Sequence, residues 1–203
     1  LDGRKTCTRR LVKFLPGENS QWTGYIKDGL MLYNGRNEPC IRKVPYQPGD
    51  IMYVRETWQY LYELDGNEQI IEGTGKYYYA ATDTIPFDTY VDASGVTHER
   101  VPWHPSIHMP KEAARIWLKV TDVRVERLQE ITEECAKKEG AIDNRGFIHS
   151  PDNEYDSVHT AREHFAEIWD STIKKSDLDR YGWNANPWVW VIEFERCEKP
   201  EGV

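Results

Sequence analysis

A near-continuous apolar run, Trp188-Val-Trp-Val-Ile-Glu-Phe194, most constrains the fold of this chain. Successive side chains of a strand point to opposite faces, so this run predicts a strand buried on both faces. Residues 115–128 instead alternate between apolar and polar side chains, which predicts a long, half-exposed strand. One face of it would carry Val120, Asp122, Arg124, Glu126 and Leu128, and the other Thr121, Val123, Val125 and Arg127.

Two helices are predicted between these strands. Residues 131–140 read as a short helix, with Thr132 as its N-cap and Gly140 as its stop. Residues 158–174 predict an amphipathic helix. Its core-facing side chains at helical spacing would be Val158, Ala161, Phe165, Ile168 and Trp169. The elements together predict an α+β fold, and a length of 203 residues suits a single domain over 1–203.

Shorter signals predict further strands. Lys-Asp-Gly, flanked by Tyr25–Ile26 and Leu30–Tyr33, indicates a hairpin. Residues 51–58 follow a Pro-Gly-Asp turn and predict a buried strand. Arg55 and Glu56 close that run on opposite faces. Each either forms a local salt bridge or lines a cleft.

Two segments are interpreted as insertions, 59–100 and 141–157. The first holds turn signals, an aromatic strand at 76–80 and a polar tip at 92–95, which predicts one or two hairpins. The second is polar and rich in turn residues. Both are expected to make few contacts with the core.

The first ten residues, Leu1-Asp-Gly-Arg-Lys-Thr-Cys-Thr-Arg-Arg10, are basic in a chain whose formal net charge is −8. Such a reversal of sign predicts a site for an anionic ligand, since focused charge concentrates that ligand. A solvated basic turn is the alternative. A strand from about residue 6 to residue 14 would point Thr6, Thr8 and Arg10 to one side.

Thr8 and Lys5 also form a candidate nucleophile and base. A threonine hydroxyl attacks a carbonyl only when a base takes its proton. A lysine amine serves as that base when burial or a nearby cation lowers its pKa from about 10.4. Arg4, Arg9 and Arg10 are the nearby cations.

Gly3-x-Lys5-x-x-Thr8-x-Arg10 resembles the G-x-K-x-x-[E/T]-x-R signature of ASCH domains, a branch of the PUA-like folds. The first ten residues and three later segments are similar to a phage- and prophage-borne ASCH group. These segments are 48–58, 103–110 and 186–195. The resemblance implies a small PUA-like β-barrel with peripheral helices and one cleft. The family usually begins with a strand and a helix before this point, so residues are expected to be missing ahead of Leu1.

ASCH members with Thr at this signature position resemble N4-acetylcytidine amidohydrolases, which use a Thr, Lys and Glu set. Ile131-Thr-Glu-Glu-Cys-Ala-Lys-Lys-Glu139 matches the spacing of the run that ends at their catalytic Glu. The resemblance therefore implies Lys5, Thr8 and Glu139 as catalytic residues. A carboxylate at a helix C-terminus is disfavoured by the dipole, which also singles out Glu139. A solvated surface glutamate is the alternative.

Further side chains are candidates for binding a nucleoside or RNA. The loop 103–110 offers a stacking indole and two imidazoles, although Trp103 and Met109 would also serve as an apolar plug. Aromatic side chains stack on bases, and the chain holds eight Trp and twelve Tyr. The full candidate set for binding is Arg4, Arg9, Arg10, Arg55, Glu56, Trp58, Trp103 and His104.

The cysteines argue against a metal centre. Cys7, Cys40, Cys135 and Cys197 are far apart and contain no Cys-x-x-Cys, so neither a zinc site nor a disulfide framework is predicted. No other cofactor is predicted. No apolar stretch reaches the ~20 residues of a membrane span, and free thiols favour a cytoplasmic location.

Three function classes follow from these patterns. The first is an amidohydrolase that removes the acyl group of an N4-acetylcytidine-like nucleoside. The second is a non-catalytic module that binds single-stranded RNA through the same cleft. The third is a ribonuclease, since some ASCH proteins have that activity. The sequence does not select among oligomeric states.

Overall fold

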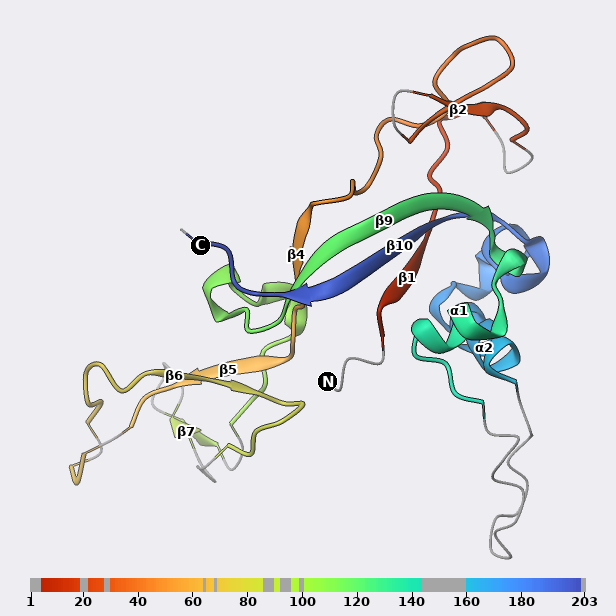
Figure 1. The fold of residues 1–203 in the computed structure, drawn as a ribbon. Coiled ribbons are helices and arrows are strands. Elements are labelled where there is room, and N and C mark those ends of the chain that lie inside the picture. Colours follow the sequence, from red (N-terminus) through yellow and green to blue (C-terminus); the bar gives the residue numbers. More distant parts are fainter. Residues whose placement is uncertain are drawn as a thin grey trace, which may run out of the picture. The chain divides into compact units, whose positions relative to one another are not determined.

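The computed structural model describes residues 5–18, 22–27, 30–63, 65–67, 69–85, 90–91, 96–98, 101–143 and 160–201. These residues form an α+β fold with a curled antiparallel sheet (Figure 1). The strands are β1 (Cys7–Leu11), β2 (Tyr25–Lys27), β3 (Met31–Tyr33), β4 (Ile51–Tyr53), β5 (Trp58–Leu61), β6 (Lys76–Tyr79), β7 (Tyr90–Val91), β8 (Thr97–His98), β9 (Trp117–Arg127) and β10 (Trp188–Cys197). The α-helices are α1 (Glu133–Lys138), α2 (Ala161–Thr172) and α3 (Leu178–Tyr181). None of them is long and apolar enough to cross a membrane.

The main sheet has the strand order β1-β10-β9-β4, and its two long strands curve together (Figure 1). β1 runs antiparallel to β10, with Cys7 opposite Glu193 and Leu11 opposite Val189. Four consecutive residues of β10, 189–192, are buried. Because successive side chains point to opposite faces, β10 is covered on both, and that prediction is confirmed.

The predicted long strand is also present, as β9. Arg124 forms ion pairs with Asp122 and Glu126, its neighbours two positions away on the same strand. Those contacts agree with the predicted alternation, which placed all three on one face. The strand predicted from about residue 6 to residue 14 is shorter in the structure, since β1 ends at Leu11.

The two predicted helices are α1 and α2. Thr132 caps α1 by accepting a hydrogen bond from the Cys135 N–H, and Gly140 follows the helix with φ of 96°. α2 buries Ala161, Phe165 and Trp169 as expected. Ile168 was expected in the core, but it is 42% exposed because it lies at the edge of the apolar face. Val158 lies outside the described residues.

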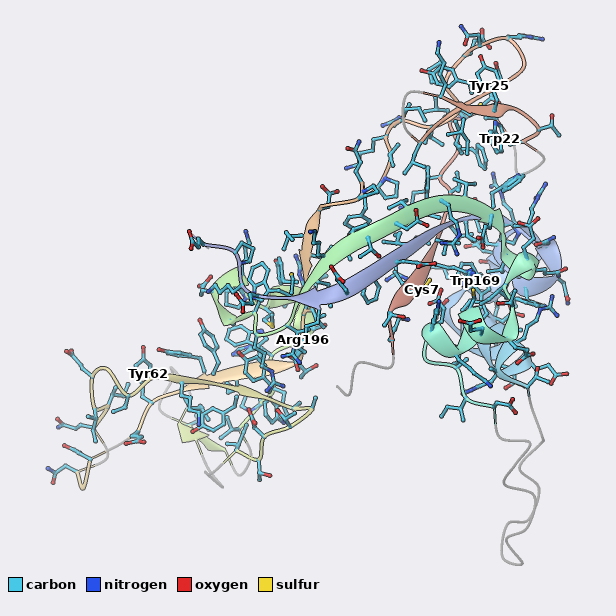
Figure 2. The ribbon with its side chains drawn as sticks, in the orientation of Figure 1. Cys7, Trp22, Tyr25, Tyr62, Trp169 and Arg196 are labelled. Atoms are coloured by element: carbon cyan, nitrogen blue, oxygen red, sulfur yellow. The ribbon has the colours of Figure 1, made fainter. Side chains whose placement is uncertain are left out.

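The chain forms two compact units. Unit 1 comprises Leu1–Ile51 and Lys119–Arg196, and unit 2 comprises Met52–Leu118 and Cys197–Val203. The core of unit 1 joins β1, β10, α1 and α2; Figure 2 labels its members Cys7 and Trp169. Its buried residues are Cys7, Leu128, Ile131, Ala136, Ala141, Ala161, Phe165, Trp169, Val189 and Val191.

Unit 1 also contains the predicted hairpin, formed by β2 and β3. Tyr25 pairs with Tyr33 across this hairpin, and their rings stack with centroids 5.8 Å apart. Leu32 on β3 is fully buried, whereas all three residues of β2 are exposed. The hairpin therefore has one protected strand and one strand in water.

Unit 2 contains two further hairpins, β5–β6 and β7–β8; β5 begins one residue before the predicted insertion 59–100, and the other three strands lie within it. The expectation of few core contacts is wrong for β6, because Tyr79 is 8% exposed and belongs to the core of this unit. Its ring is large enough to bury apolar area from an otherwise peripheral strand. The tip at 92–95 lies outside the described residues, as does most of the second predicted insertion, 144–157.

The predicted buried strand 51–58 is wrong in extent and in burial. β4 stops at Tyr53, and its first residue, Ile51, is 43% exposed. The following backbone forms other contacts: the Glu56 N–H meets Met109 Sδ at 3.2 Å. Glu56 is also buried, and its carboxylate pairs with the Arg115 guanidinium at 2.7 Å, as a buried charge requires.

Candidate functional site

β1 presents its side chains to two different environments. Cys7 belongs to the core with α1 and α2, and the Arg9 guanidinium lies 5.9 Å from the centre of the Phe165 ring of α2. Thr8 and Arg10 occupy the alternate positions, and Arg10 Nη1 donates to Thr8 Oγ1 at 2.9 Å. Thr8 and Arg10 therefore share a face, as the sequence predicts.

Glu139 lies at the junction between α1 and β1. It is the C-cap residue of α1, and the Thr6 N–H donates to the Lys138 carbonyl at 2.9 Å, which ties the start of β1 to the end of the helix. The Glu139 side chain is only 5% exposed. A solvated surface glutamate, the sequence alternative, is therefore excluded.

Two cations meet the Glu139 carboxylate. Lys5 Nζ lies 3.4 Å from Glu139 Oε2, and Arg9 Nη1 lies 3.1 Å from Oε1. The Lys5 side chain is 53% exposed, whereas the Arg9 side chain is 1% exposed. The pKa of Glu139 is raised because burial disfavours its charged form, and the two cations oppose this effect only in part.

The ion pairs continue from Arg9 to β9 and β10. Arg9 Nη2 contacts Glu126 Oε2 at 3.2 Å, and Glu126 Oε1 accepts from Arg124. Arg124 also contacts Asp122 at 2.8 Å and Glu193 at 2.6 Å. We call Lys5, Arg9, Arg124, Glu126 and Glu139 the Glu139 network.

Charge in this region is balanced rather than basic. The three cations of the network face its two glutamates and also Asp122 and Glu193, which makes four carboxylates. The basic segment seen in the sequence therefore does not present Lys5 and Arg9 as free positive charge. Arg4 lies outside the described residues.

Thr8 is buried, at 9% exposure. Its hydroxyl accepts the hydrogen bond from Arg10, and within the described residues no hydrogen bond joins it to Lys5 or Glu139. The structure thus brings two of the three predicted catalytic residues into direct contact. Thr8 is three residues along the chain from Lys5, with Arg10 beside it.

The remaining sequence candidates lie in unit 2. Arg55 is exposed and donates to the Ile107 carbonyl at 3.1 Å. Glu56 is buried and pairs with Arg115 at 2.7 Å. Trp58 and His104 form a backbone bridge, and their rings lie 4.9 Å apart.

The Arg115–Glu56 pair is part of a packed structure rather than an open binding group. The Arg115 guanidinium lies over the Tyr79 ring, 3.9 Å from its centre. Trp103 is half-buried, and Met109 is part of the unit 2 core, which agrees with the apolar-plug interpretation for Met109.

Two members of the network were missed by sequence reasoning about the site. Arg124 and Glu126 were placed on one face of a predicted strand but were not linked to the N-terminal residues. Their alternating charges on that face are the signal that could have indicated a partner for Arg9. Arg115 precedes β9 and gives no comparable signal.

The cysteines and the possible metal ligands of the described residues do not gather at one place. All four cysteines are free, and burial raises the pKa of the Cys7 thiol to about 12. Cys7 is therefore a neutral core residue and a poor nucleophile. In the part of the chain that the structure describes, no three His, Cys, Asp or Glu side chains are arranged to hold a metal ion.

Comparisons with known proteins give no relative. A scan against protein-family models, a search of curated proteins and a search of solved structures each found no match for this chain.

Proposed function

We propose that this chain is an ASCH-type protein of the PUA-like class that hydrolyses the acyl amide of an N4-acetylcytidine-like nucleoside. The observation that carries this proposal is the 3.4 Å contact between Lys5 Nζ and Glu139 Oε2. The two residues are 134 positions apart, and the ASCH resemblance selected both as catalytic from their motifs. A contact between two residues that are so far apart in the sequence, both selected beforehand, is seldom accidental.

The environment of the pair supports acid–base chemistry. A buried carboxylate with a raised pKa beside an accessible amine is typical of groups that exchange protons at functional sites. Arg10 adds a third element. Its guanidinium donates to Thr8 Oγ1, so it lies beside the position where an acyl oxygen on Thr8 would become negative.

The proposed reaction has two stages. Lys5 first gives a proton to the Glu139 carboxylate. Its amine then turns to Thr8 and takes the hydroxyl proton while Oγ1 forms a bond to the acyl carbon. Arg10 stabilises the oxyanion that this attack forms. The C–N bond then breaks as the Lys5 ammonium gives its proton to the leaving cytosine amine. Water next adds to the threonine ester, which releases acetate and restores the Thr8 hydroxyl.

The pairing of Lys5 and Arg9 weighs against a non-catalytic phosphate-binding surface, whereas Arg10 is exposed and donates to Thr8 and to the Arg9 carbonyl rather than to a carboxylate among the described residues. A phosphate-binding surface needs unpaired cations, because its affinity comes from neutralising phosphates. Lys5 and Arg9 instead share a carboxylate, and Arg9 is almost fully buried. The amidohydrolase is therefore favoured over RNA binding and ribonuclease activity, and the experiment below distinguishes the three.

The test incubates the purified chain with N4-acetylcytidine and, separately, with short single-stranded RNA. Chromatography follows cytidine and cleaved RNA, and a gel-shift assay follows bound RNA. We expect cytidine from the wild type and none above background from Thr8→Ala. Cleaved or bound RNA without cytidine release would contradict the proposal and favour one of the other two classes. Thr8→Ser, which keeps a hydroxyl, is the matched control.

A further inference from the structure

Arg9 occupies an unusual place for an arginine. Its side chain is 1% exposed, and its two terminal nitrogens contact carboxylates from different elements, Glu139 at the end of α1 and Glu126 on β9. Its Nε has no hydrogen-bond partner among the described residues. Burying a guanidinium in this way is unfavourable unless the paired carboxylates compensate it.

The side of the Arg9 guanidinium away from Glu139 is held by residues of β9 and β10. Glu126 accepts from Arg124, and Arg124 also holds Asp122 on β9 and Glu193 on β10. These three acceptors raise the pKa of Arg124, although burial alone would lower it. Arg9 is therefore anchored through β9 and β10, independently of Lys5.

The two oxygens of Glu139 have different partners as a result. Oε1 accepts from the buried Arg9, and Oε2 faces the half-exposed Lys5. We propose that Arg9 is a positioning residue, which holds Glu139 by Oε1 so that Oε2 is presented to Lys5. The inference rests on the proposed function only where it assigns Glu139 a part in catalysis. Arg9 lies outside the ASCH signature, whose arginine corresponds to Arg10.

A lysine cannot replace Arg9 in this role. One ammonium lacks the planar fork that contacts two carboxylates in fixed directions. The other ionisable groups near Glu139 are Lys5, the neutral Cys7 thiol and, through the network, Glu126, Arg124 and Glu193. Arg9 is the buried cation among these described residues, so its loss should alter Glu139 most.

The experiment uses Arg9→Lys, Arg124→Gln and a control, Arg162→Gln. Arg162 is a half-buried arginine of unit 1 whose guanidinium donates to the carbonyls of Ile131 and Gln129, whereas its backbone N–H, which the substitution keeps, donates to Glu133. Each variant is assayed for kcat and KM with N4-acetylcytidine. The titration of Glu139 is followed by NMR of ¹³C-labelled glutamate carboxyls, with its resonance assigned from Glu139→Gln.

For Arg9→Lys we expect kcat to fall about 10- to 100-fold with KM nearly unchanged, since a displaced catalytic group lowers rate more than binding. The pKa of Glu139 should rise, because Arg9 lowers it by charge and by hydrogen bonding, and a lysine keeps the charge but lacks the fork that donates to Oε1. Arg124→Gln, at the partly exposed end of the network, should produce the same changes on a smaller scale. It also keeps the test decisive if Arg9→Lys does not fold.

Arg162→Gln should leave both readouts unchanged even if it lowers the Tm. Wild-type kcat and an unchanged Glu139 titration in Arg9→Lys and Arg124→Gln would overturn the inference, as would equal shifts in Arg162→Gln. If the wild type releases no cytidine, the proposed function fails, and the titration alone then decides the role of Arg9.

Discussion

At the scale of single residues, Lys5 and Arg9 meet one carboxylate from contrasting environments. Lys5 is half-exposed on a flexible stem, and Arg9 is enclosed by the core beside Phe165. An exposed amine can turn toward a substrate and exchange a proton, whereas a buried guanidinium cannot lose its own near neutral pH. The two cations therefore have different chemical uses despite their equal charge.

Replacing Lys5 by Arg tests this distinction. Lys5→Arg keeps the positive charge near Glu139 but removes the base, so turnover of N4-acetylcytidine should fall about 100-fold or more. The melting temperature should barely change, because the side chain is 53% exposed. Steady-state kinetics and thermal unfolding measure the two effects. Full activity in Lys5→Arg would remove Lys5 as the base.

The raised pKa of Glu139 predicts how stability changes with pH. The folded state holds this proton more tightly than the unfolded state, where the ordinary value is 4.5. Its contribution is therefore fully present below 4.5 and is lost as pH rises through the higher folded pKa. Chemical denaturation across this range should show the wild type losing unfolding free energy relative to Glu139→Gln as pH rises. If the wild type instead gains unfolding free energy relative to Glu139→Gln as pH rises, Lys5 and Arg9 lower the pKa of Glu139 more than burial raises it.

The sequence reached Lys5 and Glu139 through motif spacing, but it did not reach the burial of Arg9. Arginine is seldom fully buried unless it is paired, so a strand such as 7–11 gives no reason to place it inside. Its partner Glu126 is 117 positions away. Periodicity assigns Glu126 to a face of β9 without saying which residue lies opposite.

At the scale of elements, the α1–β1 junction places Glu139. The helix stops because Gly140 adopts φ of 96°, a conformation that suits glycine. A Cβ there would be 4.0 Å from Lys5 Cβ, so it would cause no clash. The stop is therefore a matter of backbone conformation rather than of space.

Gly140→Ala should lower the free energy of unfolding by about 1 kcal/mol, the cost of the left-handed conformation for a residue with a Cβ. Gly35→Ala is the matched control, since a Cβ there meets nothing within 4 Å and its φ is not in that region. It should change stability by less than about 0.5 kcal/mol. Denaturant titration of both variants compares them, and equal effects would contradict the backbone explanation.

Strong periodicity predicted elements better than it predicted their partners. β9, β10, α1 and α2 follow from long patterns, because alternation and helical spacing reflect burial directly. The prediction of one buried strand over residues 51–58 was wrong because it rested on five apolar residues, including Trp58. A buried Glu56 interrupts that run, and local sequence does not reveal its need for Arg115.

At the scale of the whole molecule, the chain leaves unit 1 near Ile51 and re-enters it near Lys119. The sequence indicated an insertion in this region, yet it did not indicate a core for it. That core joins Tyr79 to Met109, Ala113, Ala114 and Trp117, which lie thirty or more positions further along the chain. Turn signals and short strands carry no information about such packing, which depends on how the segments meet.

The Glu56–Arg115 pair is expected to stabilise unit 2. Arg115 donates to both oxygens of the buried Glu56 carboxylate, at 2.9 and 2.7 Å, and its guanidinium covers Tyr79. Arg115→Gln would leave that carboxylate without its cation. Removing one partner of a fully buried pair costs about 3–5 kcal/mol, and the 32% exposure of Arg115 reduces the expected loss to about 1–3 kcal/mol.

Hydrogen exchange measured by mass spectrometry locates this effect. In Arg115→Gln the loss of amide protection should fall mainly within 52–118, where the contacts of Glu56, Tyr79 and Arg115 all lie. Arg55→Gln is the matched control, because Arg55 is exposed and its hydrogen bonds go to the Ile107 carbonyl and the Tyr53 hydroxyl. A comparable loss of protection in Arg55→Gln would mean that any change of charge in this segment destabilises unit 2. Protection retained in Arg115→Gln would mean that packing of Tyr79 and Trp117 suffices without the ion pair.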